Sequence, residues 1–242
     1  MPEGRLQDLI DIQNDVRMAF QWDYAEDVES ANQMRLAFDS MNPFGIENWS
    51  FNGRSETLEE ICQTLISSKR VVIIGAAAEQ EMVEKINQNG ISIIAADGSV
   101  GAVKDFRNLV CIVSDLDGGE HIDLAARSGQ KFIIHAHGDN QKKWMDIIEA
   151  WSVFSNPPKL VLSHQTNEEI SGMMNFGGFT DGDRALCFAI WAGVKVENIE
   201  LLGFSTKKIG HWSGMTNREK KLKKLVWMEK IVSMFNLDNQ ID

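Results

Sequence analysis

Two aspartates, Asp115 and Asp117, stand one residue apart in the segment 114–119, which reads Ser-Asp-Leu-Asp-Gly-Gly. If the chain turns at the glycines, both carboxylates can face one cation. Mg²⁺ prefers oxygen ligands, and proteins usually hold it with one or two carboxylates together with phosphate oxygens and water. The segment therefore predicts a magnesium site. The competing interpretation is a plain acidic turn, because Asp and Gly are common in turns.

Two histidines, His135 and His137, are followed by Asp139 and Asn140 in a second polar segment. Histidines at this spacing could ligate a transition metal, donate hydrogen bonds to phosphate or act as general acids. The alternative is a hydrogen-bonded end of a strand, in which Asp139 or Asn140 caps the following helix. We expect at least one of His135, His137 and Asp139 to have a functional role.

A third segment, 177–184, reads Gly-Gly-Phe-Thr-Asp-Gly-Asp-Arg and leads into a helical pattern. Helix N-termini preceded by glycines bind phosphate through free N–H groups and the helix dipole. Because Asp181 and Asp183 would repel a bare phosphate, they suit a site where Mg²⁺ lies between them and the phosphate, with Arg184 as a forked donor. The alternative is that acidic residues simply favour the first helical turn. That alternative explains neither the glycine pair nor Arg184.

The composition disfavours several classes of protein. The 242 residues carry a formal net charge of −11, which is not the electrostatic footprint of a general nucleic-acid binder. The sequence contains no Gly-x-x-x-x-Gly-Lys-Ser/Thr loop, no glycine-rich dinucleotide fingerprint and no Gly-x-Ser-x-Gly elbow. A P-loop kinase, a conventional NAD enzyme and a serine hydrolase are therefore not expected.

The sequence favours a cytoplasmic protein. Its three cysteines are an odd number without metal-knuckle spacing, which argues against a disulfide framework. No apolar signal region follows the N-terminus, and no apolar run reaches the roughly 18 residues that span a bilayer. We expect neither a nucleic acid nor a membrane among the partners. The oligomeric state stays open and includes a homo-oligomer.

These polar segments need elements that bring them together. Residues 5–41 predict two helices, and residues 56–67 predict a third. Short apolar, β-branched runs then alternate with helical segments; the runs are 71–74, 91–95, 109–113, 132–134, 160–162 and 199–202. This alternation is typical of a mostly parallel sheet with helices on both faces. We predict an α/β fold with a helical N-terminal segment, 1–68, and an α/β catalytic domain, 69–242.

A basic amphipathic helix is predicted at 217–235, near the end of the chain. Basic amphipathic helices can contact a membrane surface or a partner. A helix that packs its apolar stripe against the sheet is the favoured interpretation.

Polar residues follow the second to fifth predicted strands, whereas Gly75 and Gly203 follow the first and the sixth. Asp97 and Gly98 follow the second strand, and the segments 114–119 and 135–140 follow the third and fourth. In open parallel sheets, ligands bind outside the carboxyl ends of the strands. We therefore expect these residues to share one edge of the sheet.

Asp97-Gly98 and the three polar segments occur in an order that resembles the archaeal 6-hydroxymethyl-7,8-dihydropterin pyrophosphokinases. The chain is also distantly similar to thiamine pyrophosphokinase. The resemblance runs from the first helices to about Gly210 and implies a Rossmann-like, thiamine-pyrophosphokinase-like catalytic domain. It implies Mg²⁺-dependent transfer of diphosphate from ATP to the hydroxymethyl group of a pterin, with release of AMP. Two departures are Ser114, where the family usually has Thr, and residues 76–80, which replace a Gly-Pro-Ser-Leu type loop.

Carried over to this chain, the resemblance implies that Asp115 and Asp117 bind the metal and that Asp139 joins the same acidic centre. We expect catalytic roles for Asp115, Asp117, His137, Asp139 and Arg184. The residues expected to bind ATP or the pterin are Asp97, Gly98, His135, Asn140, Gly177, Gly178, Thr180, Asp181 and Asp183.

The expected mechanism is in-line attack by the hydroxymethyl oxygen on the β-phosphorus of ATP. Arg184, with Lys207 or Lys208, would stabilise the charge on the transferring diphosphate or on AMP. His135, His137 or a carboxylate would take the proton. Phe176, Phe179 and Trp212 are candidates for a slot that holds the pterin ring.

Three alternatives remain beside this hypothesis. Thiamine diphosphokinase would use the same reaction with another acceptor. A metal-dependent phosphohydrolase would also use Asp and His clusters. A non-catalytic nucleotide-binding module is favoured only by the altered loop at residues 76–80.

Overall fold

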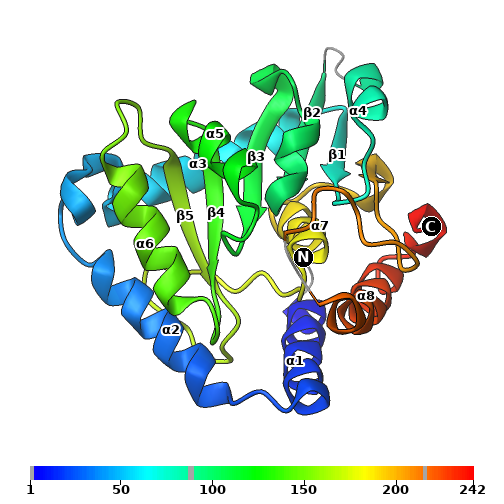
Figure 1. The fold of residues 1–242 in the computed structure, drawn as a ribbon, viewed down its shortest axis with the longest axis horizontal. Coiled ribbons are helices and arrows are strands. Elements are labelled where there is room, and N and C mark those ends of the chain that lie inside the picture. The colour runs from blue at the N-terminus through cyan, green and yellow to red at the C-terminus, as the bar shows by residue number, and fades with distance from the viewer. Residues whose placement is uncertain (1–2, 87–89, 215–216) are drawn as a thin grey trace.

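A six-stranded parallel sheet forms the centre of the molecule, as the computed structural model in Figure 1 shows; residues 3–86, 90–214 and 217–242 are described. The strands are β1 (Arg70–Ile74), β2 (Ile91–Ala96), β3 (Leu109–Ser114), β4 (Lys131–Ala136), β5 (Lys159–His164) and β6 (Ile199–Leu202). Nearly all of their residues are buried on both faces of the sheet. This explains why the strands read as continuous apolar runs rather than as alternating patterns.

Helices cover both faces of the sheet, which confirms the predicted α/β class. The first face carries α1 (Glu3–Phe20), α3 (Phe51–Ser67), α7 (Asp181–Trp191) and α8 (Arg218–Ser233). The second face carries α2 (Tyr24–Ala37), α4 (Gln80–Ile86), α5 (Glu120–Arg127) and α6 (Gln141–Ser152). Within the described ranges, no helix is both long enough and apolar enough to cross a bilayer.

The predicted N-terminal helical segment contributes to the same two core layers as the sheet. Leu9 and Val16 of α1 pack with the strands on one face, and Met34 and Phe38 of α2 pack with them on the other. The third helix begins earlier than residue 56, because the Ser50 side chain accepts a hydrogen bond from the Gly53 N–H and caps α3 at its start. The first and last long helices, α1 and α8, lie side by side (Figure 1), and an ion pair between Asp15 and Lys230 at 3.5 Å links them.

The strand order β5-β4-β3-β2-β1-β6 contains one reversal. From β1 to β5 each new strand is added on one side, whereas β6 returns to the other side of β1. The loops that leave the carboxyl ends of β1 and β6 meet at this reversal, where the Ala77 N–H donates to the Gly203 carbonyl at 3.0 Å. Ligands of open α/β sheets bind at such a switch point.

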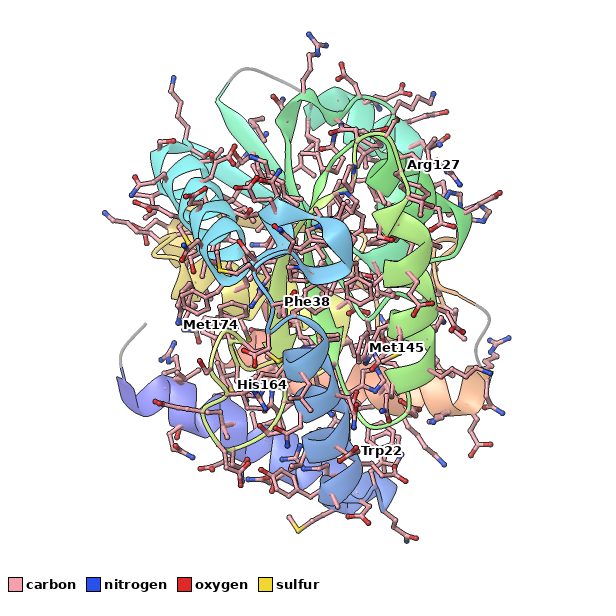
Figure 2. All side chains as sticks on the ribbon, turned by 90° about the vertical axis from the view of Figure 1, so that its left-hand side faces the viewer. Trp22, Phe38, Arg127, Met145, His164 and Met174 are labelled. Atoms are coloured by element: carbon pink, nitrogen blue, oxygen red, sulfur yellow. The ribbon has the colours of Figure 1, made fainter. Side chains whose placement is uncertain are left out.

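His164 ends β5 as a buried side chain, labelled in Figure 2. Its Nδ1 accepts a hydrogen bond from the Thr166 backbone N–H at 3.2 Å, and the Thr166 hydroxyl oxygen lies 2.9 Å from the same nitrogen. An accepting Nδ1 carries no proton, so the ring is neutral. Burial accordingly lowers the pKa of His164 to about 4.

The free energy of unfolding should therefore fall as the pH drops from about 6.5 to about 4. In this window the unfolded chain, whose histidine pKa is about 6.5, binds a proton that the folded chain excludes. The contribution reaches at most about 3 kcal/mol. Denaturant titrations at about pH 7 and pH 5 measure it, and His164→Asn, which keeps an acceptor but cannot titrate, should show a shallower dependence. Equal pH dependences in the two proteins would contradict the neutral assignment.

Candidate active site

Three aspartates cluster at the carboxyl ends of β2 and β3. Asp97, Asp115 and Asp117 each contribute a carboxylate oxygen, and these oxygens lie within 4.8 Å of one another. Oδ1 of Asp115 is buried and has no hydrogen-bond partner among the described residues. A buried carboxylate oxygen without a donor is costly unless a cation satisfies it. The donor set is all oxygen, which suits Mg²⁺.

Ser114 and two glycines bring the two acidic loops together. The Ser114 hydroxyl donates to Oδ1 of Asp97 at 2.5 Å and accepts the Leu116 N–H at 2.8 Å. A Cβ on Gly118 would lie 2.6 Å from the backbone nitrogen of Gly98, so the loops touch backbone to backbone. The hydroxyl of residue 114, which Ser and Thr share, therefore links the Asp97 carboxylate to the loop after β3.

Two non-glycine residues of these loops adopt left-handed backbone conformations. The φ angle is 49° at Asp97 and 69° at Leu116. Such conformations cost on the order of 1–3 kcal/mol each and persist where the surroundings enforce them, often at functional sites. Here they turn the carboxylates of neighbouring loops toward one another.

The carboxylates of this cluster repel one another. Burial, and then the nearby charges of Asp181, Asp115 and Asp117, raise the pKa of Asp97 well above its usual range. Burial and the charge of Asp115 also raise the pKa of Asp181, to about 7. Four carboxylates this close together, of which only Asp117 is exposed, are unfavourable without a counter-ion. A divalent cation would relieve this repulsion.

His137 lies between two carboxylates and is held in its protonated form. Its Nε2 lies 3.3 Å from Asp115 Oδ2, and its Nδ1 lies 2.7 Å from Asp139 Oδ1. Burial opposes protonation, but the two hydrogen bonds outweigh it and raise the pKa of His137 to about 9. The ring is therefore a cation that orients Asp115. It has no free nitrogen to take a proton from a substrate.

The structure places Asp97, rather than the predicted Asp139, beside Asp115 and Asp117. Asp139 points to His137 instead, and its side chain is 68% exposed. The reason is the local turn after β4, which the ion pair with His137 completes. Asp139 is thus a partner of the cluster's histidine and not a member of the cluster.

His135 and Asn140 brace the loops rather than face a ligand. The nitrogens of the buried His135 ring contact the Ser163 hydroxyl at 3.0 Å and the Gln165 amide oxygen at 3.3 Å. Asn140 accepts the His137 N–H at 3.0 Å and donates to the carbonyls of Asp115 and His135. Asn140 stands at the N-cap position of α6, but its side chain does not cap the helix.

Thr180 and Asp183 form a capping box at the start of α7. The Asp183 carboxylate accepts the N–H groups of Phe179 and Thr180 and the Thr180 hydroxyl. Because both of its oxygens are occupied, Asp183 stabilises the helix start and is not available to a metal. Gly177 and Gly178 have φ angles of 80° and 85° and form the preceding turn.

Arg184 extends from the first turn of α7 toward the carboxylates. Its guanidinium contacts Asp181 Oδ1 at 3.3 Å and Gln165 Oε1 at 3.0 Å. Its Nε is buried and has no partner in the described part of the chain. The side chain therefore keeps a donor for an anionic ligand next to the cation site.

Gln165 links this arginine to the N-terminal helices through a buried ion pair. Its amide nitrogen donates to both oxygens of Asp27 at 2.9 Å, and Asp27 pairs with Arg17 at 3.0 Å. The Gly138 N–H also donates to Asp27, at 2.8 Å. The helices before the sheet thus support the loops that carry Arg184 and His137.

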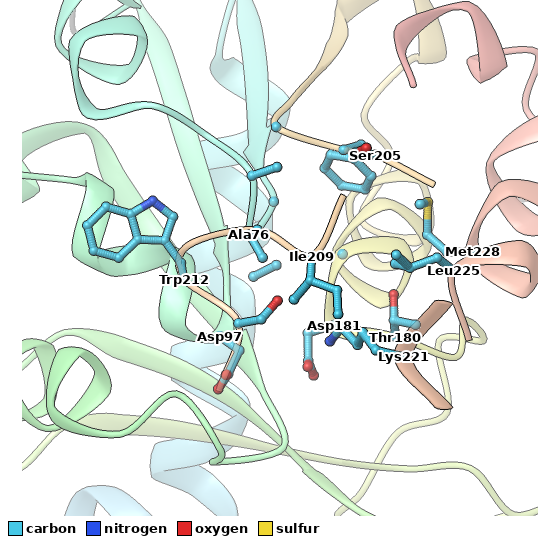
Figure 3. Close-up of a pocket in the computed structure, with 18 of the residues that line it drawn as sticks. Ala76, Asp97, Thr180, Asp181, Ser205, Ile209, Trp212, Lys221, Leu225 and Met228 are labelled. Carbon is cyan, nitrogen blue, oxygen red and sulfur yellow. The ribbon is translucent and has the colours of Figure 1, made fainter. Parts of the chain in front are cut away.

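Two adjoining pockets flank the carboxylates. One, the switch-point pocket, has roughly 630 Å³ of empty space and lies between the loops after β1 and β6 (Figure 3). The other, the basic pocket, has roughly 570 Å³. Both are lined by Asp117, Thr180, Asp181, Gly214 and Lys221.

The aromatic residues predicted for the pterin slot differ in their placement. Phe176 packs edge-on against Phe188 and Trp191 in the core. Phe179 lines the basic pocket, and Trp212 lines the switch-point pocket. Of the two predicted lysines, Lys208 lines the switch-point pocket, whereas Lys207 lines neither.

Some pocket residues were not among the predicted site residues. Trp22, in the turn between α1 and α2 (Figure 2), and Lys221 and Lys224 of α8 line the basic pocket. The ring of His121 packs edge-on against Trp212, with centroids 5.1 Å apart. The one feature of the sequence that could have indicated these residues is the i, i+3 spacing of Lys221 and Lys224, which places both on one face of the helix.

Comparison with known proteins identifies relatives with one shared description. No protein-family model matches the chain. A protein of Pyrococcus furiosus is 34% identical over 176 residues, which cover 69% of this chain and 72% of the relative. A protein of Methanocaldococcus jannaschii is 29% identical over 185 residues, which cover 72% of this chain and 69% of the relative. A protein of Methanothermobacter thermautotrophicus is 32% identical over 108 residues, which cover 43% of this chain and 42% of the relative. Each is named 6-hydroxymethyl-7,8-dihydropterin pyrophosphokinase.

Proposed function

Because the chain belongs to the family of 6-hydroxymethyl-7,8-dihydropterin pyrophosphokinases, we propose that it transfers the terminal diphosphate of ATP to the hydroxymethyl oxygen of this pterin and releases AMP. The observation that carries the proposal is the cluster of the buried Asp97, the half-buried Asp115 and the exposed Asp117, with one pocket on either side. A reaction between two substrates needs two binding places that meet at the reacting atoms.

Mg²⁺ is part of the proposal. The unpartnered Asp115 oxygen and the all-oxygen donor set support Asp97, Asp115 and Asp117 as the residues that would hold it. When bound, Mg²⁺ would neutralise charge on the phosphate oxygens and polarise the phosphorus.

Arg184 and His137 have separate tasks in this proposal. The Nε of Arg184 is free to donate to the transferring diphosphate, while the rest of the guanidinium is fixed by Asp181 and Gln165. His137 fixes the Asp115 carboxylate and adds a positive charge to the basic pocket. Both side chains are set before substrate arrives, so little reorganisation accompanies the reaction.

Asp181 is proposed as the group that takes the proton of the acceptor hydroxyl. It lines both pockets and lies outside the group of three clustered aspartates. As the hydroxymethyl oxygen forms its bond to the β-phosphorus, its proton passes to an Asp181 carboxylate oxygen. The bond between the β-phosphorus and the oxygen bridging it to the α-phosphate breaks, and AMP leaves with that electron pair.

Asp181→Asn should lower kcat for AMP release by about 10²–10⁴-fold, because a positioned general base usually accelerates a reaction by this factor. Pterin binding, followed by the quenching of pterin fluorescence, should remain within a few-fold of the wild type, because Asn has nearly the same shape. Unchanged kcat in a folded Asp181→Asn protein would exclude Asp181 as the proton acceptor.

Product analysis tests the proposed reaction. The protein is incubated with ATP, Mg²⁺ and 6-hydroxymethyl-7,8-dihydropterin, and the products are identified by mass spectrometry and phosphorus NMR. AMP together with a pterin diphosphate supports the proposal. ADP with a pterin monophosphate, or ADP with free phosphate, would overturn it in favour of a simple kinase or a phosphohydrolase.

A cytoplasmic location also belongs to the proposal. The three cysteines, Cys62, Cys111 and Cys187, are unpaired, which supports a reducing compartment. Both proposed substrates, ATP and the pterin, are small molecules.

A further inference from the structure

The two pockets differ in charge. The basic pocket is lined by the cations Arg184, Lys221 and Lys224 and by Asp115, Asp117 and Asp181, whereas the cations of the switch-point pocket are Lys208 and Lys221 beside Asp97, Asp117 and Asp181. Lys221 and Lys224 are half-buried, and neither forms an ion pair with a carboxylate of the described residues. The carboxylates attract Lys221 and Lys224 only from beyond ion-pair distance, so both ammonium groups remain available to a polyanionic ligand.

Aromatic rings in the basic pocket contact Lys224 and the neighbouring Lys220. Trp22 stacks on Phe20 with centroids 4.8 Å apart, and Nζ of Lys224 lies 5.3 Å from the Trp22 centroid. Nζ of Lys220 lies 5.3 Å from the same ring, and Nζ of Lys224 is 5.6 Å from the Phe179 centroid. Cations over these rings are stabilised by the ring quadrupole. The same contacts leave the rings unsuited to stacking on a flat substrate.

The switch-point pocket has the opposite character. Figure 3 shows Ile209, Leu225 and Met228 facing its interior, with Asp97 and Asp181 at one side. Its walls near β1 and β6 are backbone, because a Cβ on Gly210 would lie 2.0 Å from the Ala76 carbonyl group. Charged side chains also line this pocket, namely Asp97, Asp117, Asp181, Lys208 and Lys221, but its apolar residues and backbone polar groups suit a flat, uncharged heterocycle.

The position of the carboxylates distinguishes the two rings that the reaction involves. In the pterin, one methylene group separates the ring from the attacking oxygen. In ATP, the ribose and the α-phosphate separate adenine from the β-phosphorus. The ring in a pocket directly beside the carboxylates is therefore the pterin.

We propose that the basic pocket binds the triphosphate of ATP, with Lys221 and Lys224 of α8 as its clamp, and that the switch-point pocket binds the pterin ring. The assignment rests on the proposed function. One helix serves both substrates: Lys224 faces the triphosphate, and Leu225 and Met228 face the pterin. Lys221 lines both pockets, at the place where the diphosphate passes from donor to acceptor.

Steady-state kinetics with both substrates varied tests the assignment. Lys224→Met, which keeps an apolar stem, should raise KM for ATP at least tenfold and leave KM for the pterin within about twofold. Ile209→Trp, which fills the switch-point pocket from a loop, should do the reverse. Lys223→Met is the matched control, because Lys223 is an exposed lysine of the same helix that pairs with Glu219 at 2.9 Å. It should change neither constant.

Opposite results would overturn the assignment. If Lys224→Met raises KM for the pterin alone, or Ile209→Trp raises KM for ATP alone, the pockets are exchanged. Should Ile209→Trp fail to fold, Ile209→Ala must still change KM for the pterin selectively. If the wild type shows no transfer at all, the proposed function fails, yet the clamp stays testable. Calorimetry should then still show that Lys224→Met binds a non-hydrolysable ATP analogue more weakly than Lys223→Met does. Equal affinities of the two variants would refute the role of Lys224 in binding the triphosphate.

Discussion

Asp115→Asn should lower AMP release on the order of a thousandfold while the protein stays folded. The substitution removes the charge of the carboxylate whose Oδ1 is buried without a partner, and it takes from His137 one of its two anionic contacts. Loss of one carboxylate ligand from a site of three weakens the hold on a divalent cation. Initial rates of AMP release, together with calorimetric titration of Mg²⁺ or Mn²⁺ into the protein, measure both consequences.

Asp139→Asn is the informative control for this experiment. Asp139 also contacts His137, but its side chain is 68% exposed, and exposed ion pairs contribute only about 0.2–1 kcal/mol. The rate of AMP release by Asp139→Asn should therefore stay within about fivefold of the wild-type rate. Equal losses in the two variants would contradict the placement of Asp139 outside the cation site, and normal turnover by Asp115→Asn would remove Asp115 from it.

Asp27→Ala should lower the free energy of unfolding by about 3–5 kcal/mol, the range for breaking a buried ion pair from one side. It leaves the guanidinium of Arg17, the amide of Gln165 and the N–H of Gly138 without their shared acceptor. For a chain of this size the melting temperature should drop by roughly 6–20 °C. Because Gln165 also fixes Arg184, AMP release below the melting temperature should fall as well.

Asp23→Ala provides the comparison for the loss of a carboxylate near the start of α2. Asp23 caps that helix by accepting the Ala25 N–H at 2.9 Å, and its loss should cost about 1 kcal/mol. Denaturant titrations of both variants separate the two effects. If Asp27→Ala unfolds at the same denaturant concentration as Asp23→Ala, the network through Arg17 and Gln165 does not stabilise the fold.

The strand ends were predictable because of the physics of parallel sheets. Strands buried on both faces must be continuous apolar runs, and in this sequence the second to fifth runs lead into polar residues, whereas the first and sixth end at Gly75 and Gly203. The prediction therefore identified the sheet and placed Asp97 and the segment 114–119 at one edge. The order of the polar segments also indicated the family that the comparisons identify.

The choice among nearby polar residues was not predictable from the strand ends. Asp97 and Asp139 both follow strands, and only the contact between Asp139 and His137 removes Asp139 from the cluster. Asp183 has a local role that the sequence allowed, since Thr180 three residues earlier makes a capping box with it. In such cases a structural and a functional interpretation fit the same pattern until the side chains are placed.

Residues that come from distant parts of the chain were beyond sequence patterns. Trp22 and Lys224 stand about two hundred residues apart, and their contact depends on α1 and α8 lying on the same face of the sheet. The amphipathic pattern of α8 indicated a helix packed on the sheet. It did not show that the helix end nearest the carboxylates would carry lysines into a pocket.

Initial rates of AMP release from ATP and Mg²⁺ test the central claim most directly, with 6-hydroxymethyl-7,8-dihydropterin, thiamine or no acceptor present. We predict rapid release with the pterin and only background release with thiamine or without an acceptor. Release with thiamine alone would contradict the pterin assignment, and equal release with and without an acceptor would show that the site hydrolyses ATP instead of transferring its diphosphate.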